Sequence, residues 1–246
     1  MNILALYNSK GGVGKTAAAV NFAYLAAREG RRTLVWDLDP QAAATFYFRI
    51  KPRVKGTRKV LGGKRDLDEA VKGTDFDHLD LVPGDFDYRN MDLLFGDTKK
   101  PAQQLRKRLK PMTAEYDLVI LDCPPSMSVV SENIFRAADA LVVPTIPTTL
   151  SLRTLEQLLD FLGDNEVAAP VWPFFSMVDR RKRMHQQTMA ARPDPRARLL
   201  EHTIPYASPV EKMGEARAPV FEFAPSSTAA RSFRDLWQEV NARLET

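Results

Sequence analysis

A glycine-rich segment, Lys10-Gly11-Gly12-Val13-Gly14-Lys15-Thr16, follows an apolar run and precedes an alanine-rich helical pattern. A strand that leads into such a loop and then a helix directs backbone N–H groups and the positive end of the helix dipole at one point. That arrangement suits an anion, and the ending Gly-Lys-Thr is typical of a site for nucleotide phosphates. Ser9 stands where the usual pattern has its first glycine, and Lys10 adds a second lysine.

Each residue type in this loop has a physical role. The glycines can adopt positive φ and let phosphate oxygens approach the backbone, while Lys15 supplies a charge to the β and γ phosphates and Thr16 a hydroxyl to Mg²⁺. We therefore predict a nucleotide and Mg²⁺ as cofactors, with the nucleotide bound by Gly11, Gly12, Val13, Gly14, Lys15, Thr16 and Ala17. The alternative is a glycine-rich helix entry with two solvated lysines.

Carboxylates follow two later apolar runs. The run Thr33–Trp36 ends in Asp37-Leu38-Asp39-Pro40, and the run Leu118–Leu121 ends in Asp122. Open α/β sheets bind ligands at the carboxyl ends of their strands, and a central strand that ends in aspartate delivers a carboxylate to Mg²⁺ beside a phosphate loop. Asp122 is thus a predicted metal ligand. Pro40 ends its strand and frees Asp39 to face the loop, the alternative for Asp39 being a solvated turn.

Composition narrows the class of protein. The 246 residues suffice for one large α/β core, and no composition break divides them, so we predict a single domain over residues 1–246. One cysteine, Cys123, cannot form an internal disulfide or supply the paired ligands of an iron–sulfur reductase; we predict a structural role for it and a cytoplasmic location. The three histidines have no metal-ligand spacing, and no apolar segment approaches the length of a membrane span.

Basic residues cluster in three places. Residues 49–65 hold eight cations and no acid, a second run lies within the predicted helix Ala102–Leu109, and the third comprises Arg180, Arg181, Lys182 and Arg183, followed by Arg192, Arg196 and Arg198. Such clusters neutralise phosphates and bind duplex DNA without sequence preference. The alternative for the third cluster is an exposed helix start, and for the first two a solvated surface.

With Lys10 included, the loop resembles the deviant Walker A motif of the ParA/MinD family of P-loop ATPases, and Asp-x-Asp-Pro-Gln at Asp37 and Asp-Cys-Pro-Pro-Ser at Asp122 resemble its two switch segments. The resemblance implies that Lys10 reaches across a nucleotide-sandwich dimer to the partner's phosphates. It further implies that Asp39 places the attacking water, so that Lys10, Lys15 and Asp39 are the catalytic residues, and that Asp37 joins Thr16 and Asp122 near the magnesium.

The same resemblance implies further sites and partners. Met177, Val178 and Pro205 would wall the adenine, and the segment 210–217 with Arg217 would contact DNA or a partner. The implied cycle is an ATP-bound homodimer that grips nonspecific double-stranded DNA on the nucleoid and is released by slow hydrolysis, stimulated by a ParB-like or cargo-adaptor protein. The cargo is a plasmid, a chromosome or a protein compartment.

The predicted fold is a doubly wound, mainly parallel sheet with helices on both faces. We expect a last short strand at Glu201–Ile204 and a closing helix at Ser226–Thr246, capped by Ser226 or Ser227, whose apolar stripe packs on the sheet or, alternatively, targets a membrane. Rival functions are a MinD-type or flagellar-placement membrane-cycling ATPase and a dethiobiotin-synthetase-like P-loop ligase. A binding module without hydrolysis conflicts with the presence of Asp39 and Asp122.

Overall fold

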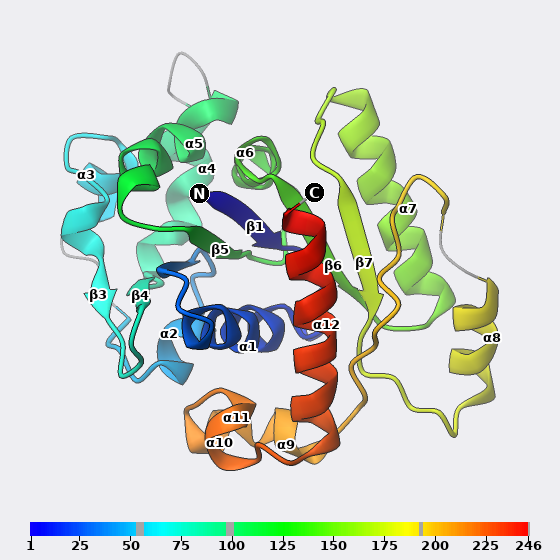
Figure 1. Ribbon diagram of the computed structural model, residues 1–246. Helices are drawn as coiled ribbons and strands as arrows, with labels where there is room; N and C mark the ends of the chain where they lie inside the picture. Colours follow the sequence, from blue (N-terminus) through cyan, green and yellow to red (C-terminus); the bar gives the residue numbers. More distant parts are fainter. Residues whose placement is uncertain (53–56, 97–100, 192–193, 246) are drawn as a thin grey trace.

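The computed structural model describes residues 1–52, 57–96, 101–191 and 194–245, and its central feature is one twisted sheet (Figure 1). The strands within these residues, in spatial order, are β3 (Lys72–Gly73), β4 (Leu79–Val82), β2 (Thr33–Asp37), β5 (Leu118–Asp122), β1 (Asn2–Leu6), β6 (Ala140–Thr145) and β7 (Val171–Phe175). Every neighbouring pair is parallel except β3 and β4. The predicted mainly parallel sheet is therefore confirmed.

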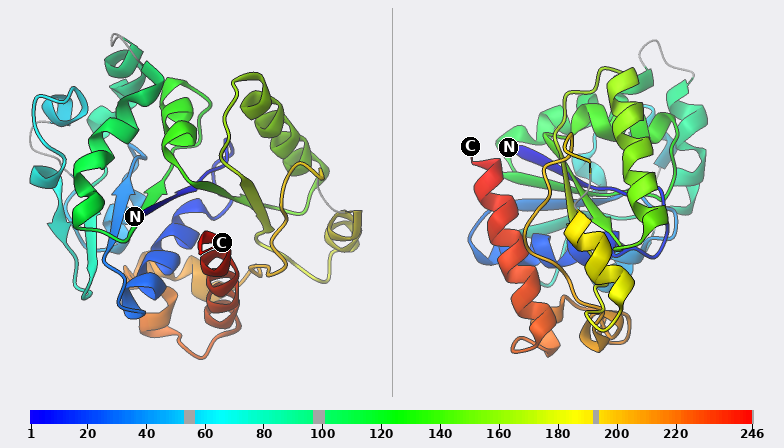
Figure 2. Two further views of the ribbon diagram at one scale, coloured as in Figure 1. Left: turned by 45° about the horizontal axis from the view of Figure 1, so that its top comes forward. Right: turned by 90° about the vertical axis from the view of Figure 1, so that its right-hand side faces the viewer.

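Helices cover both faces of the sheet (Figure 2). Strand residues alternate between two cores: Ile3 and Ala5 join one, Leu4 and Leu6 the other. The first core is closed by α3 (Thr57–Leu61), α4 (Met91–Gly96), α5 (Gln104–Leu109), α6 (Val129–Ala137) and α7 (Thr149–Asp164). The second core is closed by α1 (Lys15–Arg28), α2 (Ala43–Tyr47), α10 (Met213–Ala216), α11 (Val220–Phe223) and α12 (Thr228–Leu244).

Two further short helices are α8 (Arg183–Ala191), which follows β7 at one side of the molecule, and α9 (Ser208–Glu211), which follows the segment that runs beside β7. Val210 of α9 packs against the second core. Cys123 is fully buried at the end of β5, and burial raises the pKa of its thiol, as expected for a structural residue.

The closing helix α12 packs on the sheet. Its N-cap is Ser227, whose hydroxyl accepts a hydrogen bond from the Ala230 amide at 3.1 Å. The apolar stripe Phe233, Leu236, Trp237 and Val240 is almost wholly excluded from water. The stripe is therefore core, and the alternative that it lies free for a membrane is wrong. Among the described residues, no helix combines the length and apolarity needed to span a bilayer.

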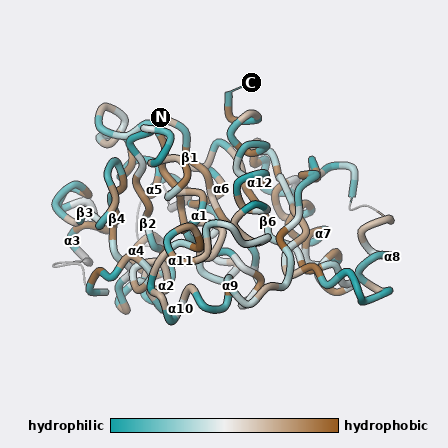
Figure 3. The backbone as a smooth tube through the Cα atoms, turned by 60° about the horizontal axis from the view of Figure 1, so that its bottom comes forward, coloured by the Kyte–Doolittle hydropathy of each residue, from teal (hydrophilic) through white to brown (hydrophobic). Residues whose placement is uncertain are grey.

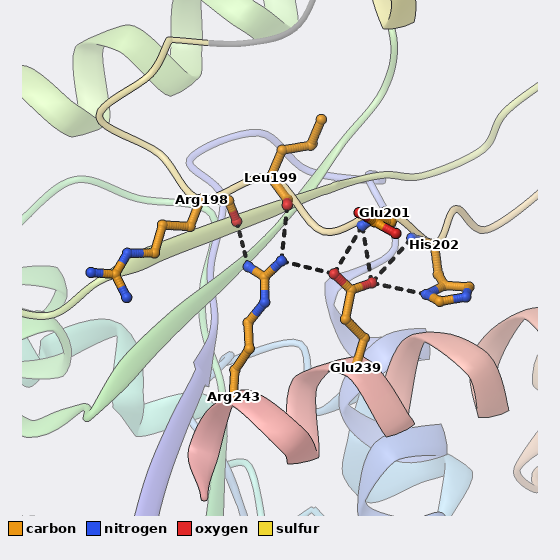
Figure 4. Close-up of polar contacts among 6 residues, drawn as sticks. All are labelled: Arg198, Leu199, Glu201, His202, Glu239 and Arg243. Carbon is orange, nitrogen blue, oxygen red and sulfur yellow. Dashed lines mark hydrogen bonds and ion pairs between the residues drawn. The ribbon is translucent and has the colours of Figure 1, made fainter. Parts of the chain in front are cut away.

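The predicted strand Glu201–Ile204 does not form. Leu200 and Ile204 donate to carbonyls of β7, but the amides of Glu201 and His202 donate instead to the Glu239 carboxylate on α12 (Figure 4). A side chain therefore takes the donors that a strand would need. The segment runs beside β7 without forming a regular ladder.

Pro173 is accommodated because β7 is the last strand of the sheet. Its carbonyl accepts from Leu200 at 2.8 Å on the outer side, and the N and C=O of one strand residue point to the same side. The missing N–H thus removes no bond to β6, as expected for proline in an edge strand.

Candidate nucleotide-binding site

The loop between β1 and α1 has the backbone that a phosphate cradle requires. Gly12 and Gly14 adopt positive φ, at 70° and 97°, and Gly14 is the N-cap of α1. A Cβ built on Gly14 would lie 2.9 Å from the Ser176 Oγ at the end of β7. Glycine is thus needed at position 14 for both its conformation and its close neighbour. Gly11 is not in this region of φ.

Lys15 points back into the loop from the first turn of α1. Its side chain is buried, and its Nζ donates to the Lys10 carbonyl at 2.9 Å. Burial lowers the pKa of this ammonium, while the carboxylates of Asp122 and Asp39 and the thiol of Cys123 oppose that effect. The loop therefore holds a cation surrounded by acidic groups.

Asp122 is the most exceptional carboxylate of the site. It is fully buried, and neither of its oxygens accepts a hydrogen bond of good geometry from a described residue. Burial and the facing Asp37, its register partner across β2 and β5, raise its pKa well above the usual range, whereas the Thr16 hydroxyl and Lys15 lower it. A buried carboxylate without donors is costly unless a ligand satisfies it.

Mg²⁺ fits this donor set. Thr16 and Asp122 offer the hydroxyl and carboxylate oxygens that Mg²⁺ prefers, and Mg²⁺ is commonly held by one or two carboxylates together with substrate phosphates. Within residues 1–52, 57–96, 101–191 and 194–245, no group of three His, Cys, Asp or Glu side chains could hold a metal by itself. Water or nucleotide oxygens would complete the coordination of a metal held here.

Asp37 is held by the protein itself. Its Oδ2 accepts from the amide and the hydroxyl of Thr45 at 2.9 and 2.7 Å, and its Oδ1 accepts from the Asp39 amide at 3.2 Å. Burial raises the pKa of Asp37 to about 6 against the effect of these hydrogen bonds. The Thr45 hydroxyl also accepts from the Gly84 amide at 2.7 Å, which joins α2 to the end of β4.

Asp39 closes a turn at the edge of the site. Its Oδ1 accepts from the Gln41 amide at 2.9 Å and so closes a turn after Pro40. The same carboxylate is close enough to Lys15 and Asp122 to raise the pKa of both. Asp39 is thus both a turn residue and a charge at the edge of the site.

Lys10 lies apart from Lys15. Its Nζ donates to the Leu150 carbonyl at the start of α7, at 2.8 Å on the exposed surface, while its amide donates to the Asn8 Oδ1. Asn8 in turn donates to the Pro144 carbonyl of β6 at 2.9 Å. Its amide side chain therefore fixes the start of the loop against the neighbouring strand.

The predicted adenine wall is a small apolar cavity beside the loop. Met177 and Pro205, far apart in sequence, both line it together with Gly14 and Ala17. Val178 is buried behind them and forms an isolated parallel bridge with Pro205. The structure thus brings the predicted wall residues to the phosphate loop.

Comparison with known proteins identifies the family of this chain. Residues 1–167 match a family described as AAA domain. The chain is 34% identical over 254 residues to the chromosome-partitioning ATPase Soj of Thermus thermophilus, which covers 98% of this chain and 96% of that protein. This chain belongs to the ParA/MinD family of P-loop ATPases.

One further relative and one solved structure show how much of the chain is similar to known proteins. The chromosome partitioning protein ParA of Myxococcus xanthus is 36% identical over 158 residues, 63% of this chain but only 56% of that protein. Among solved structures, the apo McdA of Cyanothece superposes with a TM-score of 0.86 at 21% identity, covering 98% of this chain and 99% of that one. At that identity, the second likeness establishes the fold alone.

The described residues that were predicted to bind DNA lie on separate elements of this ParA/MinD-family chain. Arg180, Arg181, Lys182 and Arg183 are exposed before and at the start of α8, with Arg181 paired to Asp179 at 3.0 Å. Arg217 lies near α10, and Figure 3 shows α9 between α8 and α10. In the third predicted cluster, the charge of Arg196 is compensated because Arg196 pairs with Asp160 and Asp194. Arg192 lies outside the described residues.

Arg217 is fixed to the helix that follows Asp37. Its guanidinium lies 4.5 Å from the centre of the Phe46 ring, and its Nε donates to the Phe46 carbonyl at 3.2 Å. The Arg49 Nε donates to the Arg217 carbonyl at 3.1 Å, so part of the first basic run meets Arg217 here. Residues 53–56 of that run lie outside the described residues.

Sequence reasoning missed the residues that support the site. Thr45, Asn8 and Ser176 carry no motif, and each is recognised only by its contacts. For Gly84 the signal was a Pro-Gly pair after a strand. Its reason is steric, because a Cβ there would lie 2.8 Å from Ala42 and 3.0 Å from the Asp37 carboxyl carbon.

Proposed function

We propose that this chain is a Mg²⁺-dependent ATPase that dimerises when it binds ATP, holds duplex DNA without sequence preference in that state, and positions a cargo such as a plasmid, a chromosome or a protein compartment. Family membership and the chromosome-partitioning function named for its Thermus relative support this proposal. We further propose slow hydrolysis that a ParB-like or cargo-adaptor protein stimulates, and a place on the nucleoid.

The observation that carries the proposal is Asp122, a fully buried carboxylate beside Thr16 and Lys15 that accepts no hydrogen bond of good geometry from a described residue. Such a group is expensive to keep unless a cation neutralises it. Thr16 and Asp122 would hold Mg²⁺, with Asp37 behind them, because they offer the oxygen ligands that this metal prefers. When bound with ATP, the metal would neutralise charge on the β and γ phosphates.

The remaining residues act on the phosphates and the attacking water. Lys15, held against the loop backbone, places its charge at the β and γ phosphates. Asp39 orients the water from the edge of the site. Lys10 leaves the Leu150 carbonyl and reaches the phosphates of the partner subunit; the exposed bond that it gives up is worth only about 1 kcal/mol.

DNA binding follows from dimerisation in this scheme. Each subunit presents Arg180, Lys182 and Arg183, which are exposed, and a dimer doubles the number of phosphate contacts. Affinity for DNA rises steeply with that number and falls with salt. Nucleotide state then controls whether the protein stays on DNA.

The first test is Lys10→Ala. We expect a protein that binds ATP but remains a monomer by light scattering with a nonhydrolysable ATP analogue, and that no longer holds DNA. The matched control is Lys72→Ala, which removes an exposed lysine outside the loop and outside the three basic runs. An unchanged dimer in Lys10→Ala would contradict the role of Lys10.

The second test is Asp39→Ala. This variant should bind ATP, dimerise and stay on DNA, because only the placement of water is lost. ATP hydrolysis and release from DNA are both measured, each at low and at high salt. Wild-type turnover would refute the assignment of Asp39.

The two rival functions predict other outcomes in the same assays. Retention on anionic liposomes instead of DNA would favour a membrane-cycling ATPase. Rapid turnover with a small carboxylic acid acceptor, and no effect of DNA, would favour a ligase.

A further inference from the structure

A second large cleft lies at the end of the sheet opposite to the phosphate loop. It is lined by Ile3 at the start of β1, by Ala138 and Asp139 just before β6, and by residues 167–169 just before β7. These are the amino ends of parallel strands, whereas the loop and the switch carboxylates follow carboxyl ends. The cleft is therefore separated from the nucleotide site by the length of the strands.

The size of this cleft suits a polypeptide segment. Its free volume is about 1250 Å³. Pockets for small molecules enclose roughly 300–1000 Å³. The cleft exceeds that range and is an open groove between α5, α6 and the end of α7.

The cations of this cleft come mainly from α5 and the residue after it, Lys110. Gly62 and Gly63, from the run 49–65, line the cleft beside α5. The charged lining residues are the cations Arg106, Lys107, Arg108, Lys110 and Arg136 and the acids Asp139 and Glu166. Five cations therefore face two carboxylates, one of which, Asp139, already accepts from the Ile3 amide at 2.7 Å.

Arg108 and Arg136 build the walls. The Nε and Nη2 of Arg108 donate to the Leu61 carbonyl at 3.2 and 3.0 Å and so join α5 to α3. Gly63, at φ 71°, lies against this guanidinium, where a Cβ would collide with it. Arg136 donates to Glu132 and to the Asn165 carbonyl at 2.9 Å each, which ties α6 to the end of α7.

The other three cations are available to a ligand. Arg106, Lys107 and Lys110 are exposed and form no ion pair with any residue that the structure describes. Below this basic rim the lining is apolar: Met1, Val167, Ala168 and Ala169 keep part of their surface open to water, whereas Leu109 and Phe135 are fully buried. The cleft thus combines an apolar lining with three free positive charges.

This combination favours a peptide over a single-stranded nucleic acid. Single-stranded nucleic acids bind by stacking on exposed aromatic rings, and Phe135, the aromatic ring among the described lining residues, is fully buried. A peptide can instead place apolar side chains on the apolar lining and carboxylates on the rim. The charge of the rim selects acidic side chains.

We propose that this cleft docks an acidic, amphipathic segment of a partner protein, with its carboxylates on Arg106, Lys107 and Lys110. The position of the cleft makes this contact independent of nucleotide and of dimerisation. A partner held here stays attached while ATP is bound and hydrolysed at the opposite edge, so the contact serves as a tether.

The test uses a defined probe, a fluorescein-labelled peptide of about 12 residues in which glutamates alternate with leucines and alanines. Anisotropy is measured with the full chain, with and without ATP and Mg²⁺, and with Lys15→Ala. We expect equal binding in all these states, and binding weaker by about tenfold or more when glutamine replaces every glutamate of the peptide.

The decisive variant is the triple change Arg106→Glu, Lys107→Glu and Lys110→Glu, checked for folding by its thermal midpoint. This variant should bind the peptide about tenfold or more weakly. The control changes three exposed cations outside the cleft, Arg153→Glu, Lys72→Glu and Lys212→Glu, and its affinity for the peptide should change by less than about twofold. An equal loss in both triples would show charge attraction without a site and overturn the proposal.

Two other outcomes would also overturn it. Peptide binding that requires ATP would place the contact on the nucleotide-dependent dimer. Loss of duplex DNA retention in the first triple, with peptide binding unchanged, would assign the cleft to nucleic acid. Because peptide binding is also measured in the absence of nucleotide, that measurement does not depend on whether the chain hydrolyses ATP.

Discussion

Asp122 is a fully buried carboxylate and Glu239 a partly buried one, and their surroundings are opposite. Neither oxygen of Asp122 accepts a hydrogen bond of good geometry from a described residue. Glu239 accepts from the amides of Glu201 and His202, lies 2.9 Å from the His202 Nδ1, and pairs with the Arg243 Nη2 at 2.8 Å (Figure 4). Arg243 also donates to the carbonyls of Arg198 and Leu199.

The pKa values of the two groups shift in opposite directions. Burial and the charge of Asp37 raise the pKa of Asp122. Burial also raises that of Glu239, but hydrogen bonds from Glu201 and His202 and the charge of Arg243 outweigh it and leave the pKa below its usual value. The comparison teaches that a satisfied carboxylate fastens two segments, whereas an unsatisfied one marks a place for a ligand.

Asp122→Asn should have the largest effect. It removes the charge that a metal would use, so we expect Mg²⁺-dependent hydrolysis to fall by about 100-fold or more. The stabilisation of the fold by Mg²⁺ with ATP should disappear as well, as measured by thermal unfolding. Asp160→Asn, on the exposed surface of α7, is the control and should keep both. Full activity in Asp122→Asn would remove the distinction between the two carboxylates.

Thr45→Val tests the intermediate case, since Asp37 is buried but has donors. The change removes the hydroxyl that donates to Asp37 and accepts from Gly84, and leaves both groups short of a partner. We expect a loss of about 2 kcal/mol in the free energy of unfolding by urea. Thr154→Val, whose hydroxyl donates to the Leu150 carbonyl on the exposed side of α7, should cost less than about 0.5 kcal/mol.

Glu239→Gln should have a smaller effect than Thr45→Val. It weakens the bonds from Glu201, His202 and Arg243, but solvent reaches this group and screens its charge, so we expect a loss of about 1 kcal/mol. Urea unfolding at neutral pH measures it, with Glu156→Gln on the exposed face of α7 as the control. A loss of nucleotide binding, with stability unchanged, would mean that Glu239 does not stabilise the fold by joining α12 to the segment beside β7.

The smallest expected effect is the pH dependence of the difference in unfolding free energy between wild type and Glu239→Gln. It tests whether the charge of Glu239 causes that difference. Because the pKa of Glu239 is lowered in the folded state, its contribution is present above the unfolded value of about 4.3 and is lost as the pH falls through the folded value. The gap between wild type and Glu239→Gln should therefore close below roughly pH 4. A gap that is constant down to that range would indicate packing instead of charge.

Much of the candidate nucleotide-binding site could be predicted from sequence because the residues that form it are adjacent in the chain or end a clear apolar run. Gly14, Lys15 and Thr16 are adjacent, and Asp122 ends an unbroken apolar run whose strand is unmistakable. The fold class followed from the same alternation of apolar runs and helical patterns. The roles of Lys10 and Asp39 stay predictions, since only their positions are seen.

The rest could not be predicted because it depends on contacts between distant segments. The strand expected at Glu201–Ile204 fails because Glu239, far along the chain, takes its donors. Thr45 is important only because Asp37 and Gly84 lie beside it in space. The meeting of Gly63 with Arg108 is likewise invisible in sequence.

One helix turn carries two of the attachments described above. Thr45 holds Asp37, and the next residue, Phe46, holds Arg217 through its ring and its carbonyl. A ligand that draws Asp37 forward must either break the bonds to Thr45 or carry Arg217 with it. If a partner bound around Arg217, such a movement would link its affinity to that of the ligand at the carboxylates, and each would change the other by the same factor.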